Sequence, residues 1–256
     1  MKASAIKTVN KLLLLTLSLL FSTTSLASEL RVAVAANFLG TLNQLAPLYE
    51  AHSGQTLLIS SGSTGRHYAQ IRNGAPFDVF LSADVERPQL LVDEGLALAD
   101  SRFTYARGVL VLWSDQQDLP LQGGEFLHSE SLQHLALVNP RTAPYGAAGV
   151  EVMQQLGAYE RLQAGHIAQA ENLTQAMQYI TSGTAQAGFL ALSQVIETDG
   201  SIRGNTWLPD VDSYASLEQQ AVVLSASPQL EAGQAFLYWL KSDQARAVIE
   251  AAGYGF

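Results

Sequence analysis

The sequence contains no cysteine among its 256 residues. No disulfide can support the fold, and no thiolate is available as a metal ligand. The hydrophobic core therefore has to hold the structure together, and a hydrophobic content of 48% makes this possible for a chain of this length.

Basic residues are scarce, with 14 lysines and arginines against 23 aspartates and glutamates. Three of the lysines lie in residues 1–27, which contain no acid, so removal of that segment would take the net charge from −9 to −12. Such an acidic chain is a poor partner for nucleic acid or for an anionic membrane surface. It could bind a small anion only where local dipoles overcome the overall field.

Long hydrophobic runs are also missing, and the nearest approach is at the N-terminus. Lysines precede the apolar run 12–21, and Ser25-Leu26-Ala27 then matches the small-x-small pattern of a cleavage site. The run is shorter than the roughly 18 residues of a membrane span. This pattern predicts a signal peptide over residues 1–27, export to the periplasm, and no stable insertion into the membrane.

Signals of catalysis are weak. The five histidines show no close pair spacing, so we expect neither a metal site nor a cofactor. The turn 62–65 matches neither a P-loop nor a nucleophile elbow. A periplasmic serine hydrolase with Ser63 as its nucleophile remains an alternative of a different class, which turnover of a chromogenic ester would test. Our main expectation is that the chain is not an enzyme.

Short β-rich runs alternate with amphipathic helical stretches along the chain, which indicates an α/β fold. Strands are expected near residues 30–35, 57–60, 78–81, 109–113, 135–138, 187–192 and 220–224, and helices near 38–52, 147–156, 230–240 and 242–252. We expect two lobes, the first comprising residues 28–107 plus 217–256 and the second comprising residues 108–216. Hinges are expected near residues 105–108 and 213–219.

One feature recurs where strands end: a small polar or glycine-containing turn opens a helix. It occurs at residues 35–37, 61–65, 144–146 and 171–174. The first turn of a helix has unpaired N–H groups and a partial positive charge, so it can bind an anion without lysine or arginine. For any single turn, ordinary helix capping is the simpler interpretation.

A longer motif gives these turns a context. Residues 74–84 read Gly-Ala-Pro-Phe-Asp-Val-Phe-Leu-Ser-Ala-Asp. This stretch resembles the signature of periplasmic molybdate-binding proteins, which typically reads Gly-Ala-Pro-x-Asp-aliphatic-Phe-aliphatic-Ser-Ala-Asp. Residues 35–38, 60–65, 139–140 and 253–256 match the same family, so the resemblance covers essentially the whole mature chain.

The resemblance implies a type II periplasmic binding protein fold, in which two α/β lobes close on a ligand in the cleft between them. It implies a receptor that captures molybdate or tungstate and delivers it to the membrane permease of an ABC transporter. The family binds the oxyanion through hydroxyl and amide donors, with no direct bond between protein and molybdenum. We expect a monomer without a cofactor.

Carried over position by position, the family's ligand-binding residues fall on all four turns: Ala36, Asn37, Ser63, Thr64, Tyr145 and Leu173. Many members have a ligand-binding tyrosine where this sequence has Ala191. We infer that Tyr145 supplies the phenol from another direction, as in the subgroup that has asparagine at the Asn37 position. Arg66 follows the second turn and is expected on a solvated helix face.

The choice of oxyanion follows from its protonation and its size. Molybdate and tungstate are fully deprotonated near neutral pH and need only donors, whereas a phosphate carries a proton and needs an acceptor. Sulfate is smaller, so its hydrogen bonds in a rigid cavity would be long, and each unmade bond costs about 1–3 kcal/mol. A receptor for sulfate, chromate or another tetrahedral oxyanion remains the alternative within the same class.

Overall fold

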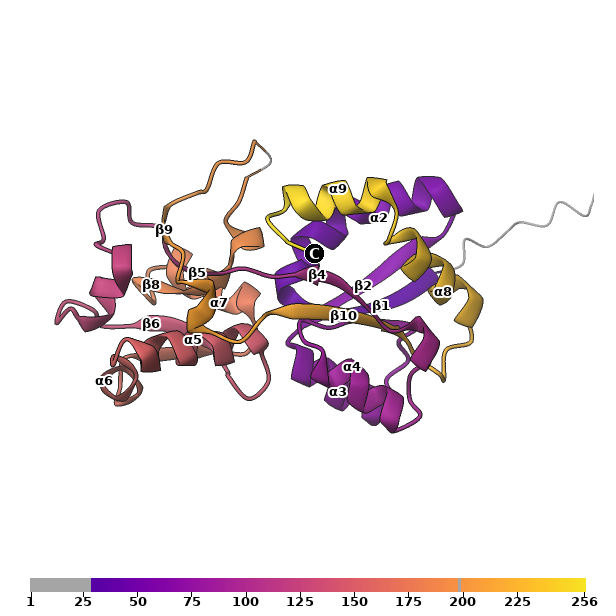
Figure 1. Ribbon diagram of the computed structural model, residues 1–256, viewed down its shortest axis with the longest axis horizontal. Coiled ribbons are helices and arrows are strands. Elements are labelled where there is room, and N and C mark those ends of the chain that lie inside the picture. The colour runs from indigo at the N-terminus through magenta and orange to yellow at the C-terminus, as the bar shows by residue number, and fades with distance from the viewer. Residues whose placement is uncertain (1–28, 198) are drawn as a thin grey trace, which may run out of the picture.

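The computed structural model describes residues 29–197 and 199–256. The predicted signal peptide therefore lies outside the described residues. The described chain forms two lobes that lie side by side, each built around a five-stranded mixed sheet with helices packed on it (Figure 1). No helix in this part of the chain is long and apolar enough to cross a membrane.

The first lobe contains the sheet with strand order β2-β1-β3-β10-β4. Its strands are β1 (Glu29–Ala35), β2 (Thr56–Gly62), β3 (Val79–Leu81), β4 (Phe103–Arg107) and β10 (Glu218–Val223). β1 is parallel to β2 and to β3, and β10 is antiparallel to β3 and to β4. Helices α2, α8 and α9 lie on one side of this sheet and α3 and α4 on the other (Figure 1).

The second lobe contains the sheet with strand order β7-β6-β8-β5-β9. Its strands are β5 (Leu110–Ser114), β6 (Leu135–Val138), β7 (Ile167–Ala170), β8 (Ala187–Ala191) and β9 (Asn205–Trp207). β6 is parallel to β7 and to β8, while β5 is antiparallel to β8 and to β9. The two sheets therefore share one topology, in which the first strand of the parallel trio lies between the second and the third.

The α-helices have the bounds α2 (Leu39–Ser53), α3 (Thr64–Arg72), α4 (Glu86–Asp93), α5 (Pro144–Gln155), α6 (Tyr159–Gln163), α7 (Leu173–Thr181), α8 (Leu230–Trp239) and α9 (Asp243–Ala251). The 3-10 helices are η1 (Ala36–Phe38), η2 (Ala99–Ser101), η3 (Gln122–His128), η4 (Leu192–Gln194) and η5 (Val211–Ser213). Helix α5 begins three residues earlier than the sequence predicts. Pro144 occupies its first turn, where a missing N–H costs nothing because that N–H has no partner in the helix.

The first sheet is buried on both faces. Along β1, Val32 and Val34 belong to a cluster with α2, α8 and α9, whereas Ala33 belongs to a second cluster with Ile71 of α3 and Leu91 of α4. Burial of both faces explains why these strands read as continuous apolar runs in the sequence.

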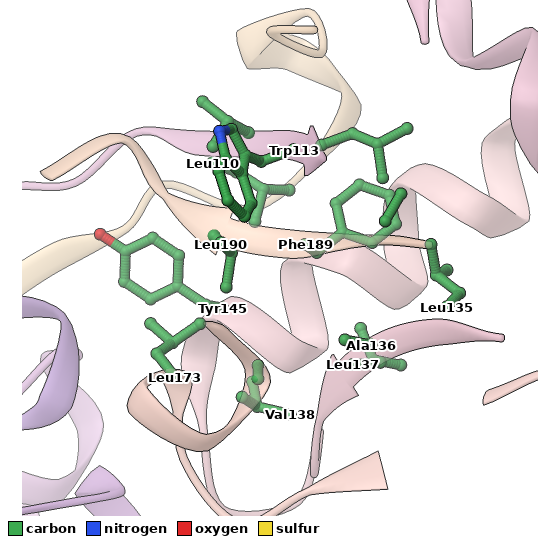
Figure 2. Packing of buried hydrophobic residues seen from close by; sticks show 14 of the residues in the cluster. Leu110, Trp113, Leu135, Ala136, Leu137, Val138, Tyr145, Leu173, Phe189 and Leu190 are labelled. Atoms are coloured by element: carbon green, nitrogen blue, oxygen red, sulfur yellow. The ribbon is translucent and has the colours of Figure 1, made fainter. Parts of the chain in front are cut away.

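The second lobe has one large cluster, centred on β5, β6 and β8 and covered by α5 and α7. Figure 2 shows Trp113, Phe189 and Leu190 among the buried residues of this cluster, with Tyr145 at its edge and the phenol oxygen pointing away from them. Four residues of the first lobe, Ala35, Ala36, Ala83 and Leu217, also belong to this cluster, so the lobes are in contact.

The chain crosses between the lobes twice, after β4 and before β10. The two crossovers lie against each other, since the Gly108 N–H donates to the Leu217 carbonyl over 2.9 Å. Both fall at the segments for which the sequence predicts hinges; motion about them stays a prediction.

Candidate oxyanion-binding site

A small cavity lies between the lobes. Its lining comes from the ends of strands and the starts of helices in both lobes: Ala35, Ala36, Asn37, Gly62, Ser63, Thr64, Ala83, Ala143, Pro144, Tyr145, Asn172 and Leu173. All six residues that the resemblance selects are among them. Ala35 and Leu173, which are 138 positions apart in the sequence, thus share one site.

Topology brings the four turns together. Helices η1 and α2 follow β1, α3 follows β2, α5 follows β6 and α7 follows β7. In each sheet, the first strand of the parallel trio separates the other two, which creates a switch point at its carboxyl end. Four helix N-termini consequently converge on the cavity, and their free N–H groups favour a negative charge there.

The second turn provides hydroxyl groups that are not used for capping. Ser63 precedes α3 in an extended conformation, and its side chain makes no capping hydrogen bond. Thr64 Oγ1 accepts a hydrogen bond from the Ala83 N–H over 3.1 Å. Because this bond occupies an acceptor position, the Thr64 hydroxyl keeps its own hydrogen free to donate.

The first turn provides backbone rather than side-chain donors. Asn37 is buried, and its Nδ2 donates to Gln219 Oε1 over 2.8 Å and to the Tyr254 hydroxyl over 3.1 Å. Both side-chain hydrogens are therefore engaged within the protein. What Asn37 and Ala36 can offer an anion is their N–H groups, which lie in the first turn of η1.

In the second lobe, Tyr145 provides the phenol. It lies in the first turn of α5 and is 1% exposed, and its hydroxyl accepts from Gln219 Nε2 over 3.3 Å. Burial raises the pKa of Tyr145 well above its usual value of 10, so the phenol keeps its proton and can act as a donor at neutral pH.

In the fourth turn, one residue caps the helix and the next offers a backbone donor. Asn172 caps α7, since its Oδ1 accepts from the Gln175 N–H over 3.0 Å. The side-chain oxygen of Asn172 is thus occupied. The N–H of Leu173, the first helical residue, has no carbonyl of its own helix within reach. Leu173 can therefore offer a backbone donor to the cavity.

The cavity lining includes no charged side chain. Arg66 is exposed and does not line the cavity, and Glu171 is exposed as well. Ala191, the last residue of β8, is fully buried and lies outside the lining. An arrangement with several donors and no carboxylate suits an anion that has no proton to share.

A larger hollow lies at the same junction of the lobes, but its chemistry is different. Its charged lining residues are Asp84, Glu86, Arg87, Glu151 and Glu218. Four carboxylates against one guanidinium oppose the approach of an oxyanion, so the small cavity is the better candidate despite its size.

The lobes are closed over the small cavity. The Gly65 N–H of the first lobe donates to the Thr142 carbonyl of the second over 2.8 Å. From the second lobe, Ser193 Oγ donates to the Asn37 carbonyl over 3.0 Å. Closure of this kind excludes water, which strengthens every dipole contact with a bound charge.

The structure gives Ser63 no catalytic partner among the described residues. The nearest histidine in sequence, His67, directs one ring nitrogen to Gln70 Oε1 over 3.1 Å and the other to the Val34 carbonyl over 3.2 Å. Burial lowers the pKa of His67, so its ring is neutral at pH 7. The geometry needed to activate a serine nucleophile is therefore missing at Ser63.

Two polar residues that support the site, Gln219 and Tyr254, were not predicted. Gln219 contacts both Asn37 and Tyr145, and Tyr254 contacts Asn37. Residues 253–256 match the family motif, which could have drawn attention to Tyr254. Gln219 has no comparable signal, because nothing in the strand's sequence distinguishes it from its neighbour Gln220.

Comparison with known proteins gives matches over nearly the whole described chain. Residues 30–255 match the family of bacterial extracellular solute-binding proteins. The molybdate-binding protein ModA of Azotobacter vinelandii is 43% identical over 230 residues, which cover 90% of each chain. ModA of Rhodobacter capsulatus is 41% identical over 228 residues, covering 89% of this chain and 88% of the relative.

A solved structure agrees with these relatives. The periplasmic molybdate-binding protein of Azotobacter vinelandii superposes with a TM-score of 0.87 at 43% identity, and the match covers 89% of this chain and 99% of the other. The fold with two α/β lobes, expected from the resemblance, is confirmed.

Proposed function

Because the chain belongs to the family of bacterial extracellular solute-binding proteins, we propose that it captures molybdate and tungstate and delivers them to the membrane permease of an ABC transporter. It is a transport receptor and not an enzyme. The observation that carries the proposal is the closed cavity at four helix N-termini, lined by donors from both lobes and by no carboxylate.

The proposed ligand contacts come from six residues in the two lobes. Thr64 and Tyr145 donate from their hydroxyl groups, and Ser63 has a hydroxyl that is free of capping. The N–H groups of Ala36, Asn37 and Leu173 complete the set. A fully deprotonated dianion uses all of these donors, whereas a protonated phosphate would present a hydrogen for which the lining offers no carboxylate.

The proposed cycle starts with the lobes open about the two crossovers. Binding of the anion bridges the lobes, and closure brings Gly65 against Thr142. The two lobes are residues 28–107 plus 217–256 and residues 108–216, a division supported by the strand membership of the two sheets. We place the mature protein in the periplasm as a monomer, exported by a signal peptide over residues 1–27.

Titration calorimetry of the chain from residue 28 tests this function. Molybdate, tungstate, sulfate, chromate and phosphate are each titrated into the same preparation. We expect tight one-to-one binding of the first two and no heat from sulfate or phosphate. Binding of sulfate or chromate instead would keep the fold and the site but would change the ligand. Silence toward all five would refute the proposed function.

A further inference from the structure

Gln219 lies next to the cavity without lining it. It is the second residue of β10, it is fully buried, and its side chain joins three polar residues from both lobes. Its Oε1 accepts from Asn37 Nδ2 over 2.8 Å and from the Tyr105 hydroxyl over 3.0 Å, while its Nε2 donates to the Tyr145 hydroxyl over 3.3 Å. A buried amide with bonds on both sides is a fixed dipole.

An irregularity in the sheet lies beside this side chain. Gln219 pairs with Ala106 of β4, but Gln220 pairs with Thr104, so the register shifts between the two glutamines. The extra residue is Tyr105 of β4, and a bulge of this kind redirects a side chain. The Tyr105 hydroxyl donates to Gln219 Oε1. Gln220 bonds instead to Thr104 and Arg102, away from the cavity.

The polarity of the Gln219 amide follows from its neighbours. Asn37 sends one Nδ2 hydrogen to Gln219 and the other to Tyr254, so the oxygen of Gln219 faces Asn37. The NH₂ group of Gln219 then faces Tyr145. A dianion in the cavity suits this direction, because the Gln219 N–H points to the Tyr145 oxygen and leaves the phenol hydrogen for the anion.

The contact between Gln219 and Tyr145 also depends on a glycine in the first crossover. A Cβ added at Gly108 would lie 2.0 Å from the Tyr145 hydroxyl oxygen and 2.7 Å from Gln219 Nε2. Because Gly108 in the first crossover has no Cβ, Tyr145 of the second lobe has room to contact Gln219 of β10.

We propose that Gln219 is a positioning residue that orients the Tyr145 hydroxyl as a donor to the bound oxyanion. The NH₂ group of Gln219 donates to a lone pair of the phenol oxygen, so the phenol hydrogen has to point away from Gln219. We expect it to point into the cavity, toward the bound anion. This role rests on the proposed function, since it concerns how that site holds its anion.

A double-mutant cycle tests the coupling. Gln219→Met, Tyr145→Phe and the double variant are titrated with molybdate, and the melting temperature of each is recorded. We expect Gln219→Met to weaken binding about tenfold when Tyr145 is present and less than about threefold in the Tyr145→Phe background. The matched control Gln220→Met makes the same change one residue along the strand and should leave the affinity unchanged. A purely structural role would shift the melting temperature without this coupling.

Gln219→Glu provides a second variant that keeps acceptors for Asn37 and Tyr105. An ionised carboxylate can only accept, so it takes the Tyr145 hydrogen away from the anion and adds a negative charge. We expect binding at least about 100-fold weaker at pH 8. Binding should recover about tenfold at pH 6, because burial raises the pKa of the introduced carboxyl and its protonated form can donate again.

The other groups near Gln219 should not titrate between pH 6 and pH 8, so they should not contribute to the pH dependence of binding in Gln219→Glu. The side chains that face it are Asn37 and the phenols of Tyr105 and Tyr145, with Tyr254 beyond, and burial raises the pKa of all three phenols. The Asp84 carboxylate also raises the pKa of Tyr105, and it is present in every variant. Gln220→Glu adds the same charge outside the network and should show wild-type affinity at both pH values.

The outcomes separate the two proposals. If the unaltered chain binds molybdate but Gln219→Met weakens binding equally in both backgrounds, or not at all, the positioning role is wrong and the proposed function stands. If the unaltered chain binds none of the oxyanions, the proposed function fails and the role of Gln219 fails with it.

Discussion

The two lobes have the same strand order but provide different donors. In the first lobe, the turns after β1 and β2 present N–H groups together with the hydroxyls of Ser63 and Thr64. In the second lobe, the turns after β6 and β7 present one phenol, from Tyr145, and the N–H of Leu173. The shared topology ensures that backbone donors converge. The topology does not determine which side chains occupy the turns, and the two lobes differ in those side chains.

The lobes also differ in how they are built around the cavity. The first sheet carries a separate cluster on each face, so the first lobe has a core of its own on both sides. The single large cluster of the second lobe reaches across the junction to Ala35, Ala36 and Ala83. The floor of the site is therefore apolar and shared, which removes water from around the donors.

The largest expected effect concerns the contact between the lobes. A Cβ at Gly65 would lie 2.9 Å from Thr142 Cα and 3.1 Å from its carbonyl oxygen, and backbone atoms cannot move aside easily. Gly65→Val should prevent full closure and weaken molybdate binding about 100-fold or more, as expected from overpacking several carbons. The measurement is calorimetric titration, with the melting temperature of the free chain as a check on folding.

Gly40→Val is the matched control, because a Cβ at Gly40 meets no atom within 4 Å. Its affinity should equal that of the unaltered chain. Equal affinity for Gly65→Val would show that the lobes do not close on the ligand in this way.

A comparison of Thr64→Val with Tyr145→Phe tests the division of donors between the lobes. Thr64→Val removes a donor to the anion and also the acceptor for the Ala83 N–H, so binding should fall about 30- to 100-fold. Tyr145→Phe removes one donor and leaves Gln219 Nε2 without its partner, and we expect a loss of about tenfold. Calorimetry at one pH and ionic strength gives both values.

Unchanged affinity in both variants would refute the assignment of the site. A larger loss for Tyr145→Phe than for Thr64→Val would reverse the comparison and make the second lobe the main source of side-chain donors.

The smallest expected effect is on stability, and it concerns the first lobe alone. Burial lowers the folded-state pKa of His67 below its usual 6.5, so the unfolded chain binds more protons than the folded chain below that pH. The contribution of neutral His67 is present above pH 6.5 and is lost as the pH falls through the lowered value. The melting temperature should drop between pH 7.5 and 5.5, and by a few degrees less in His67→Gln. Equal drops in the two proteins would mean that His67 does not contribute.

Much of the fold could be predicted from the sequence. The apolar runs of β1, β3, β5, β6 and β8 are strands because both faces of the central strands are buried. The sequence does not predict three strands, β4, β7 and β9, all of which lie at sheet edges. Residues of an edge strand are only partly covered by neighbouring elements, so they do not form a continuous apolar run. The first turn of α5 was placed too late, because the proline at its start was interpreted as part of a turn.

The candidate residues were also accessible from the sequence, through the motif resemblance rather than through any single turn. The six positions do come together around one cavity. Their chemical roles were less accessible. The resemblance selects Asn37 as a ligand-binding residue without saying which of its groups binds. In the structure both of its side-chain hydrogens are engaged by Gln219 and Tyr254, which leaves its backbone N–H for the ligand.

The sequence by itself determined the class of fold, the four helix N-termini and the acidic surface that requires dipoles to hold an anion. These follow from local patterns, since strand and helix periods and turn residues act over a few positions. Only the tertiary structure decided which hydrogens face the cavity. Gln219 is 74 residues from Tyr145 and 182 from Asn37. A hydrogen-bond direction depends on which atoms meet in the folded chain. Here they meet beside a bulge at Tyr105 of β4 and beside a glycine in a crossover.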